Sequence, residues 1–506
     1  MRHIDNRNWR NALGKLKLFV SNFLVYGMGG IIAKVVPLIM LPIITRLMPN
    51  TEYFGVSDMS AVVVSFCSAL AIMGMYDAMY RMFFDRNEDD LAYKKEICST
   101  AFVFTLCTSL IVFIVLLLLK DFIAEAFLGN KEYTYVVYIT AIATLIGATN
   151  TIVSAPTRMQ NKRGVFLITN FLSPILSYSV SIPLLLNGYY VLALPVAGVV
   201  SALILEVSFI LLNRKWFSFR KFNFKYLKQM LLIAVPLLPN FIIYWVFDSS
   251  DRLMLTNILG IGVTGIYSVS AKLGHVSQLI YTAFAGGWQF FAFSIMKEKD
   301  QVKTNSKIFE YLGIISFVCS AFVFALAEPM FKLLFEGEYV VGYIAAPYLF
   351  FAPLLLMLFQ VACNQFLVIK KTWPNMIILS LGAIVNVVFN FVFIPIIGME
   401  GAAIATLCGY TVSVIVCVLV LIKMKQMTIS FKFVLSSLFM VAFVLIWRLV
   451  VKDVIWISTL CAIALSVILI LFYLKDVKLL FSSIKNGIKK KKTEESTDAE
   501  GTENNL

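Results

Sequence analysis

Fourteen apolar stretches, each long enough to cross a bilayer, alternate along the 506-residue chain with short polar loops. Most stretches hold about 20 residues, the length that a helix needs to cross the hydrocarbon core. Lipid offers no hydrogen-bond partner to backbone amides, and the stretches are too long and too uniformly apolar for alternating strands, so the spans must be helices. The sequence therefore predicts an all-α polytopic membrane protein with about 14 transmembrane helices.

Lys and Arg residues divide unequally between two sets of loops. The two tails and the loops after even-numbered spans hold 34 of the 43 Lys and Arg residues, whereas the loops after odd-numbered spans hold 7. The other two, Lys34 and Lys272, lie within spans. Loops rich in Lys and Arg stay on the cytoplasmic side. We therefore expect both termini to be cytoplasmic.

The same topology explains the net charge of +14, because cytoplasmic loops lie beside an anionic leaflet and need no nucleic-acid partner. The eight cysteines show no paired spacing, and the only histidines, His3 and His275, cannot build a metal site. The outward loops are too short for a catalytic domain. We therefore expect no nucleic-acid binding, no enzyme activity, no metal and no cofactor, which leaves a transporter or channel.

Internal repetition groups the spans as six plus six plus two. The clearest repeat pairs Arg46, Leu47, Met48 and Gly55 with Arg252, Leu253, Met254 and Gly265. Six helices are an even number, so the two halves share one orientation, are related by a pseudo-two-fold axis along the membrane normal, and enclose a substrate path. The expected organisation is a basic N-tail (1–17), an N-lobe (18–213), an inter-lobe loop (214–229), a C-lobe (230–422), two further spans (423–474) and a basic, disordered cytoplasmic tail (475–506).

Polar side chains form stripes on three of the expected spans, the fifth, the eighth and the eleventh, and the last two carry candidate substrate-binding residues. The eighth span is expected over residues 263–293. If it is a continuous helix, one third of its circumference carries the polar side chains of Lys272, His275, Gln278 and Gln289. On the eleventh span, Asn386 and Asn390 share a face. Such groups either line a hydrophilic cavity or hydrogen-bond to neighbouring helices. The charge of Lys272 favours the cavity for the eighth span, because an ammonium at membrane depth needs water or a partner.

Charged side chains near span ends are candidates for gates. Asp77 precedes Arg81 by one helical turn, which fits a structural clasp or a gate that opens when substrate competes for Arg81. Arg158 either contacts substrate or only snorkels toward the membrane surface. The following three residues close the seventh span, expected to end at residue 247, and could form an outer gate or a lobe-to-lobe ion pair: Asp248, Asp251 and Arg252.

Glu206 stands alone in the sixth span. A lone buried acid either carries a proton or sodium ion for coupling or stays a neutral, hydrogen-bonded carboxyl. Both readings remain open from the sequence.

Several motifs together resemble the oligosaccharide flippases of bacterial polysaccharide export, the O-antigen and capsular repeat-unit transporters of the multidrug, oligosaccharidyl-lipid and polysaccharide transporter superfamily. They are Lys34, Pro37, Pro42 and Arg46; Gly74, Asp77 and Arg81; and Pro236, Asp248, Asp251, Arg252, Gly265 and Lys272. The resemblance covers the chain up to Leu474. It implies two six-helix lobes around a hydrophilic cavity, in a protein of the bacterial cytoplasmic membrane.

The function implied by this resemblance is alternating-access transfer of an undecaprenyl-pyrophosphate-linked oligosaccharide from the inner to the outer leaflet. Expected partners are this substrate, membrane lipids, a polysaccharide polymerase and glycosyltransferases. Pyrophosphate is an apt partner for Lys34 and Lys272, and Arg81 and Arg158 are further candidate substrate-binding residues. We therefore expect a cationic cavity. Two alternatives remain: a multidrug-extrusion relative, expected to present an acidic cavity to its cations, and a non-transporting scaffold of a polysaccharide-assembly complex.

Overall fold

The computed structural model describes residues 34–86, 90–280, 300–371 and 373–476, together with residues 288, 292 and 296. These residues form helices and contain no strand. Twelve helical segments among them are long and apolar enough to cross a membrane. They match twelve of the fourteen expected spans, and the first and eighth expected spans run partly outside the described residues. The prediction of an all-α polytopic membrane protein is confirmed.

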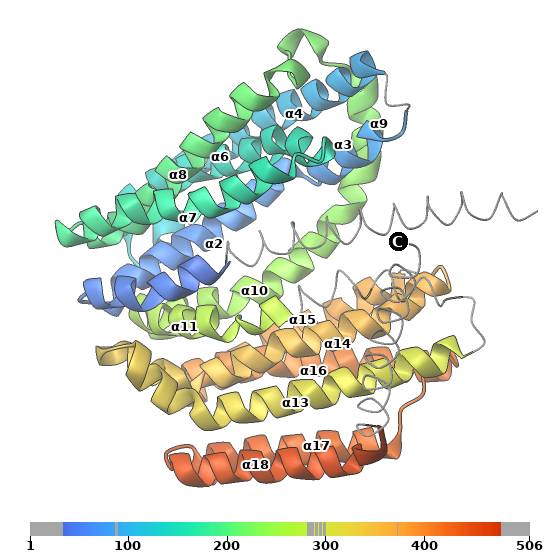
Figure 1. Cartoon of the computed structure of the whole chain (residues 1–506). Helices are drawn as coiled ribbons and strands as arrows, with labels where there is room; N and C mark the ends of the chain where they lie inside the picture. The colour runs from blue at the N-terminus through green and yellow to red at the C-terminus, as the bar shows by residue number, and fades with distance from the viewer. Residues whose placement is uncertain are drawn as a thin grey trace, which may run out of the picture.

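The chain forms two lobes, the N-lobe drawn in blue to green and the C-lobe in light green to red in Figure 1. The N-lobe holds the helical residues 34–47 and the elements α2 (Thr51–Ile72), α3 (Met75–Phe83), α4 (Leu91–Leu118), α5 (Lys120–Leu128), η1 (Lys131–Tyr133), α6 (Thr134–Met159), α7 (Arg163–Leu186) and α8 (Tyr190–Asn213). The connection to the C-lobe consists of η2 (Arg214–Trp216), η3 (Phe219–Lys221), α9 (Phe224–Ala234) and η4 (Val235–Leu237).

The C-lobe begins with a helix that crosses between the lobes in Figure 1. Its elements are α10 (Leu238–Leu259), α11 (Ile261–Gly274), α13 (Gln301–Leu334), η5 (Gly337–Ile344), α14 (Ala346–Val368), α15 (Trp373–Ile397) and α16 (Met399–Lys423). The last two spans are α17 (Phe431–Ile446), which continues as η6 (Trp447–Val451), and α18 (Ile455–Phe472).

Four expected span boundaries are wrong, and the first two errors concern the start and end of the seventh span. The expected inter-lobe loop ends early, because Asn223 caps α9 by accepting a hydrogen bond from the Lys225 amide. Pro236 then lies in the 3-10 turn that separates α9 from α10, as expected of a residue without an amide hydrogen. Finally, α10 continues to Leu259, well beyond the expected end at residue 247.

The third error concerns the eighth span, which is not one straight helix. The helix α11 ends at Gly274, and a turn at His275 and Val276 precedes the next helical residues. The second span, expected over residues 53–80, ends early with α2 at Ile72, because Met73 and Gly74 adopt left-handed backbone conformation and α3 follows as a separate helix. A Cβ at Gly74 would lie 2.7 Å from the carbonyl oxygen of Ala234, so only glycine allows α9 to approach here.

The lobes meet where α2 packs against α11 and diverge in Figure 1 toward the end that carries α3 and α9. At the contact, a Cβ on Gly55 would lie 2.2 Å from the Ile261 carbonyl oxygen, and one on Gly265 would lie 2.1 Å from the Thr51 carbonyl oxygen. The two glycines that repeat in the sequence therefore face each other across the lobe contact. Only hydrogen side chains permit this backbone approach.

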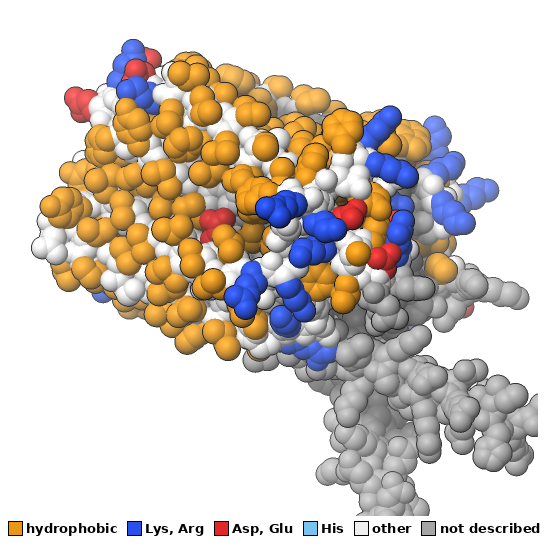
Figure 2. Space-filling view, turned by 90° about the horizontal axis from the view of Figure 1, so that it is seen from above, with side chains coloured by type: hydrophobic (Ala, Val, Ile, Leu, Met, Phe, Trp, Pro, Cys, Tyr) orange, Lys and Arg blue, Asp and Glu red, His pale blue; other side chains and the backbone are white. Residues whose placement is uncertain are grey.

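Basic side chains gather at one end of the molecule, on the right of the N-lobe surface in Figure 2, whereas apolar side chains cover most of the remaining visible surface. We call this the basic end. Its loops include residues 84–86, 160–162, 214–223, 369–371 and 424–430. The loops at the other end, which we call the opposite end, include residues 48–50, 187–189 and 335–345.

The helices α17 and α18 are fixed to the C-lobe by two buried carboxylates. Near the basic end, Glu310 accepts hydrogen bonds from the backbone amide (2.6 Å) and hydroxyl (2.8 Å) of Ser430. Near the opposite end, Glu400 accepts from Arg448 Nε at 2.8 Å and from the Tyr348 hydroxyl at 3.0 Å. The last two spans are therefore attached at both ends rather than by apolar packing alone.

Candidate functional site

Two sets of polar contacts join the two lobes in the interior of the molecule. The ammonium of Lys272 on α11 is ion-paired with Asp58 on α2, and Arg252 Nη1 on α10 lies 3.5 Å from the second Asp58 oxygen. Separately, Lys34 Nζ donates a hydrogen bond to Gln278 Oε1 at 3.1 Å. We call these five residues the central polar chain.

The ion pairs of the central polar chain lie well inside the membrane-spanning helices. Asp58 follows the start of α2 by seven residues, and Arg252 precedes the end of α10 by seven. At 1.5 Å per residue this is about 10 Å from the opposite end. The Asp58 and Arg252 side chains are only 7% and 13% exposed. A charge at such a depth needs a partner, and these ions supply one another.

Sequence reasoning missed Asp58. It treated Lys272 as an unpaired cation and assigned substrate pyrophosphate as its counter-charge, whereas Asp58 supplies that charge in this structure. The signal was present, because Asp58 is an acid within the apolar second span. Counting Lys and Arg to derive the topology took no account of acids inside spans.

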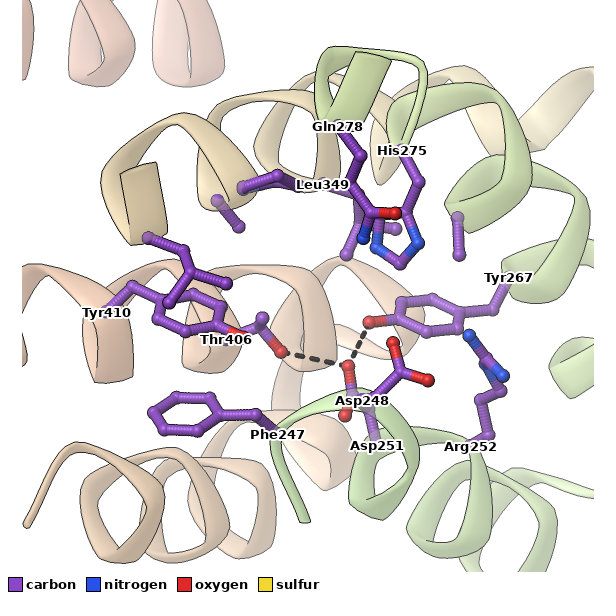
Figure 3. A pocket seen from close by; sticks show the side chains of 14 residues that line it. Phe247, Asp248, Asp251, Arg252, Tyr267, His275, Gln278, Leu349, Thr406 and Tyr410 are labelled. Atoms are coloured by element: carbon purple, nitrogen blue, oxygen red, sulfur yellow. Dashed lines mark hydrogen bonds between the residues drawn. The ribbon is translucent and has the colours of Figure 1, made fainter. Parts of the chain in front are cut away.

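A small enclosed pocket of about 30 Å³ adjoins the chain within the C-lobe (Figure 3). His275 and Gln278 point into it together with Asp248 and Arg252. Asp251 also lines it and accepts hydrogen bonds from the Tyr267 hydroxyl and from Thr406 Oγ1, the latter at 2.8 Å. This volume suits a water-sized occupant and not a sugar.

The sequence predicted that a span closes at Asp248, Asp251 and Arg252. The structure instead places these three residues inside α10. Arg252 and Asp251 use different partners, Asp58 of the N-lobe and two hydroxyls of the C-lobe. Of the three, only Arg252 forms an ion pair between the lobes in the described part of the chain.

The two asparagines of α15 do not line this small pocket. Asn386 is fully buried, accepts a hydrogen bond from Ser250 and donates one to Thr406, both at 3.0 Å. Asn390 is also fully buried, and neither atom of its amide has a hydrogen-bond partner among the described residues. Asn386 thus hydrogen-bonds to neighbouring helices in this structure, and the substrate-binding role of the two asparagines stays a prediction.

A larger cavity of about 420 Å³ lies in the N-lobe beside α2, and Lys272 reaches it from α11. Its lining includes Ser57, Asp58 and Ser60 and is otherwise mostly apolar. The Lys272 side chain is 46% exposed, so it has room to leave Asp58 and meet an anion. Glu206 does not line this cavity. It is buried and accepts a hydrogen bond from the Thr149 hydroxyl.

Arg81 and Arg158 lie elsewhere, in an open pocket of about 730 Å³ at the basic end. Asp77 lines the same pocket, yet within the described residues it forms no ion pair with Arg81 or Arg158. The helix α3 lies outside the candidate spans, and partial desolvation raises the pKa of the Asp77 carboxyl. The expected clasp between Asp77 and Arg81 is not closed in this structure. Gln289 lies outside the described residues.

The net charge of the centre differs from the sequence-based expectation of a cationic cavity. Three cations, Lys34, Arg252 and Lys272, are matched by three carboxylates that belong to the central polar chain or the small pocket: Asp58, Asp248 and Asp251. The positive charge of this region is therefore compensated while the lobes are in contact. The charges of Lys272 and Arg252 become available to a ligand only when their ion pairs with Asp58 open.

Comparison with known proteins identifies the family and the fold of this chain. A family described as "Polysaccharide biosynthesis protein" matches residues 43–341, which include α2, α10, α11 and their ion pairs. The chain belongs to this family. No curated protein sequence matches the chain significantly.

Three solved structures show the same fold at low sequence identity. The lipid II flippase MurJ in an inward closed conformation has a TM-score of 0.67 and 13% identity, over 90% of this chain and all of that one. An inward-facing multidrug resistance MATE family transporter of the MOP superfamily has a TM-score of 0.59 and 15% identity, covering 78% and 98%. A MOP superfamily transporter from Pyrococcus furiosus has a TM-score of 0.53 and 16% identity, covering 81% and 95%.

The family and the fold together describe a multi-pass membrane protein of polysaccharide biosynthesis with MOP-type architecture.

Proposed function

We propose that the protein is a flippase that moves an undecaprenyl-pyrophosphate-linked oligosaccharide from the inner to the outer leaflet of a bacterial cytoplasmic membrane. The observation that carries this proposal is the ion-paired lobe contact of Asp58 with Lys272 and Arg252, placed at membrane depth beside a cavity. The polysaccharide biosynthesis family and the MurJ-like and MATE-like fold support it.

The chemistry of the central polar chain fits an anionic cargo. Sugars and a pyrophosphate cannot cross hydrocarbon without partners, because each unsatisfied polar group costs several kcal/mol and a charge costs more. A pyrophosphate that reaches Lys272 competes with Asp58 for the ammonium. Release of Lys272 removes one of the two ion pairs of the lobe contact and leaves Asp58 paired with Arg252 alone. Binding of the cargo thereby weakens the contact and favours the open arrangement.

The charge distribution supports the proposed direction of transfer. The basic end faces the cytoplasm in this proposal, as expected from its Lys and Arg loops. The lobes diverge at that end and meet at the opposite end (Figure 1), so the substrate enters from the cytoplasmic leaflet. In this proposal the lobes pivot at the crossing of Gly55 and Gly265, where the two backbones approach closely. A polymerase and glycosyltransferases remain expected partners.

Coupling to a proton at Glu206 is part of the proposal. A single hydroxyl, that of Thr149, is its described hydrogen-bond partner. Sodium needs several oxygen ligands, whereas a buried carboxyl can hold a proton with one hydrogen bond. Replacement of Glu206 by Gln mimics the protonated form, and we expect flipping by this variant to lose its dependence on a pH gradient.

The experiment measures transfer of a fluorescent lipid-linked oligosaccharide between leaflets of proteoliposomes. We expect Lys272→Gln to lower the initial rate by about tenfold or more, because it keeps hydrogen bonding but loses the Coulomb attraction, and Lys272→Arg to keep most of the rate. Lys332→Gln, at an exposed lysine paired with Glu328, is the matched control. Wild-type transfer by stably inserted Lys272→Gln, or transport of organic cations without the lipid, would contradict the proposal.

A further inference from the structure

The pocket at the basic end is a second concentration of basic groups, and it shares no lining residue with the cavities around the central polar chain. It lies between α3, the end of α6 and the start of α7. On α3, one face turns toward it and carries Tyr76, Asp77, Tyr80, Arg81 and Phe84. These positions follow the three-to-four-residue spacing of one helix face.

The rest of the sequence of α3 explains why this face is free. The intervening side chains are buried against α9 and α4, and they include Met75, Ala78, Met79 and Met82. Apolar packing on one side thus fixes the orientation of α3 and directs its charged and aromatic side toward the pocket.

Arg158 reaches the same pocket from the last turn of α6. Its guanidinium carbon lies 4.8 Å from the centre of the Phe166 ring on α7. The turn between these helices places Asn161 in left-handed conformation, with its side-chain oxygen accepting from Arg163 Nε at 3.2 Å. A cation that stacks on an aromatic ring keeps its in-plane N–H groups available for another acceptor.

No carboxylate in the described part of the chain lies within ion-pair distance of Arg81 or Arg158. Both side chains are exposed, and the one acid of the pocket, Asp77, leaves an excess of one positive charge. If these arginines only fixed the topology, nothing would require them to converge on one cavity of about 730 Å³ lined by four aromatic rings.

We propose that this pocket is a loading site, where the sugar-pyrophosphate end of the lipid-linked substrate binds before it reaches the central polar chain. The inference rests on the proposed function and adds a site to it. Guanidinium groups bind phosphate oxygens in bidentate geometry. The neighbouring rings offer apolar faces to a sugar, with Tyr76 and Tyr80 at a centroid distance of 6.0 Å and Tyr80 and Phe84 at 5.5 Å.

The two anion sites have different roles in this scheme. The loading site binds without breaking any existing ion pair, so it contributes to affinity for the inward-facing protein. The central polar chain exchanges partners during the lobe movement, so it contributes to the rate of transfer. Loss of the loading site should therefore alter the half-saturating substrate concentration and leave the maximal rate nearly unchanged.

The test uses the full chain in proteoliposomes and measures flipping of lipid-linked oligosaccharide over a range of concentrations. We expect the double variant Arg81→Gln, Arg158→Gln to raise the half-saturating concentration by roughly tenfold, with a maximal rate within about twofold of wild type. The corresponding Lys double variant should recover part of the affinity. The matched control, Lys225→Gln with Lys228→Gln, removes two exposed charges of α9 at the same end and should behave like wild type.

Competition separates the sources of the phosphate. Unlabelled undecaprenyl pyrophosphate carrying sugars should displace the substrate from wild type better than phosphatidylglycerol does, and this preference should disappear in the Gln double variant. Equal half-saturation of the Gln double variant and the control overturns the loading site, as does equal displacement by phosphatidylglycerol. If wild type neither binds nor flips the lipid-linked oligosaccharide, the proposed function itself fails.

Discussion

The central polar chain and the loading site both contain basic side chains, but they differ in how those charges are compensated. In the centre, Lys272 and Arg252 share the buried carboxylate of Asp58, and Lys34 donates to Gln278. At the basic end, Arg81 and Arg158 line an open pocket with no ion-pair partner in the described part of the chain. The same residue types are therefore bound to partners in one place and available in the other.

Solvent accounts for this difference. An arginine close to water is hydrated, so leaving it unpaired costs little and pairing it gains little. A cation about 10 Å inside a membrane-spanning helix loses that hydration and requires a counter-ion. In the proposed mechanism an anionic cargo consequently binds at the basic end directly, whereas in the centre it has to replace Asp58. The first arrangement suits capture, and the second suits a conformational switch.

The largest effect is expected at Asp58. Asp58→Ala removes the carboxylate that compensates Arg252, which is 13% exposed, and leaves a buried charge unpaired. We expect the free energy of unfolding to fall by about 3–5 kcal/mol, the range for breaking a buried ion pair. Thermal unfolding of the purified protein in detergent measures the loss.

A double variant controls for a simple packing defect at this position. Asp58→Asn with Lys272→Gln removes one charge of each sign and should be more stable than Asp58→Asn alone, since the two substitutions are coupled. If Asp58→Ala unfolds at the wild-type temperature, the ion pairs do not hold the lobes together. The difference in charge compensation between the central polar chain and the loading site then has no consequence for stability.

An intermediate effect is expected for chemical accessibility. In a background without the eight native cysteines, Lys34→Cys and Lys272→Cys should react with a membrane-impermeant thiol reagent, because Lys34 is exposed and Lys272 is 46% exposed. Arg252→Cys should react more slowly by roughly tenfold, since the reagent would reach it only through opening of the lobe contact. Absence of labelling at both positions, from either side of the membrane, would show that water reaches neither position 34 nor position 272.

The smallest effect is expected at Asp77. The structure contains no clasp with Arg81, so Asp77→Asn should change the free energy of unfolding by no more than about 0.5 kcal/mol. Because the pKa of Asp77 is raised in the folded protein, the folded state binds the proton more readily than the unfolded state. Wild-type stability relative to the variant should therefore increase as the pH falls through the raised pKa toward the ordinary value of 3.8.

Export assays sharpen this last comparison. Arg81→Ala should impair export while Asp77→Ala leaves it intact. Restoration of export by exchanging the two residues, after a loss in both single variants, would instead show that a clasp forms in another conformation.

Hydropathy predicted the spans well, because a stretch of about 20 apolar residues has few alternatives to a membrane helix. Polar positions were harder to interpret. Asn386 was compatible with a cavity or with an interhelical hydrogen bond, and the structure shows the bond, since Ser250 and Thr406 come from other helices. Helical periodicity specifies which face a residue occupies but not which helix covers that face.

Boundaries failed where the backbone deviates from a regular helix. The breaks at Gly74 and after Gly274 interrupt apolar sequence without a proline at the break, so hydropathy gave no sign of them. Conversely, the charged residues Asp248 to Arg252 suggested the end of a span, but α10 continues because their partners lie on neighbouring helices.

The sequence by itself determined the helical class, the number and order of most spans, the charge difference between the two ends and the repeat that pairs Gly55 with Gly265. These properties depend on composition, length and local spacing, which the chain carries without reference to its fold. Only the tertiary structure decided that those glycines touch, that Asp58 compensates Lys272 and Arg252, and that Arg81 and Arg158 share a pocket. The partners are separated by tens to hundreds of residues, and an ion pair depends on which helices pack together, a choice made by the sum of many contacts across both lobes.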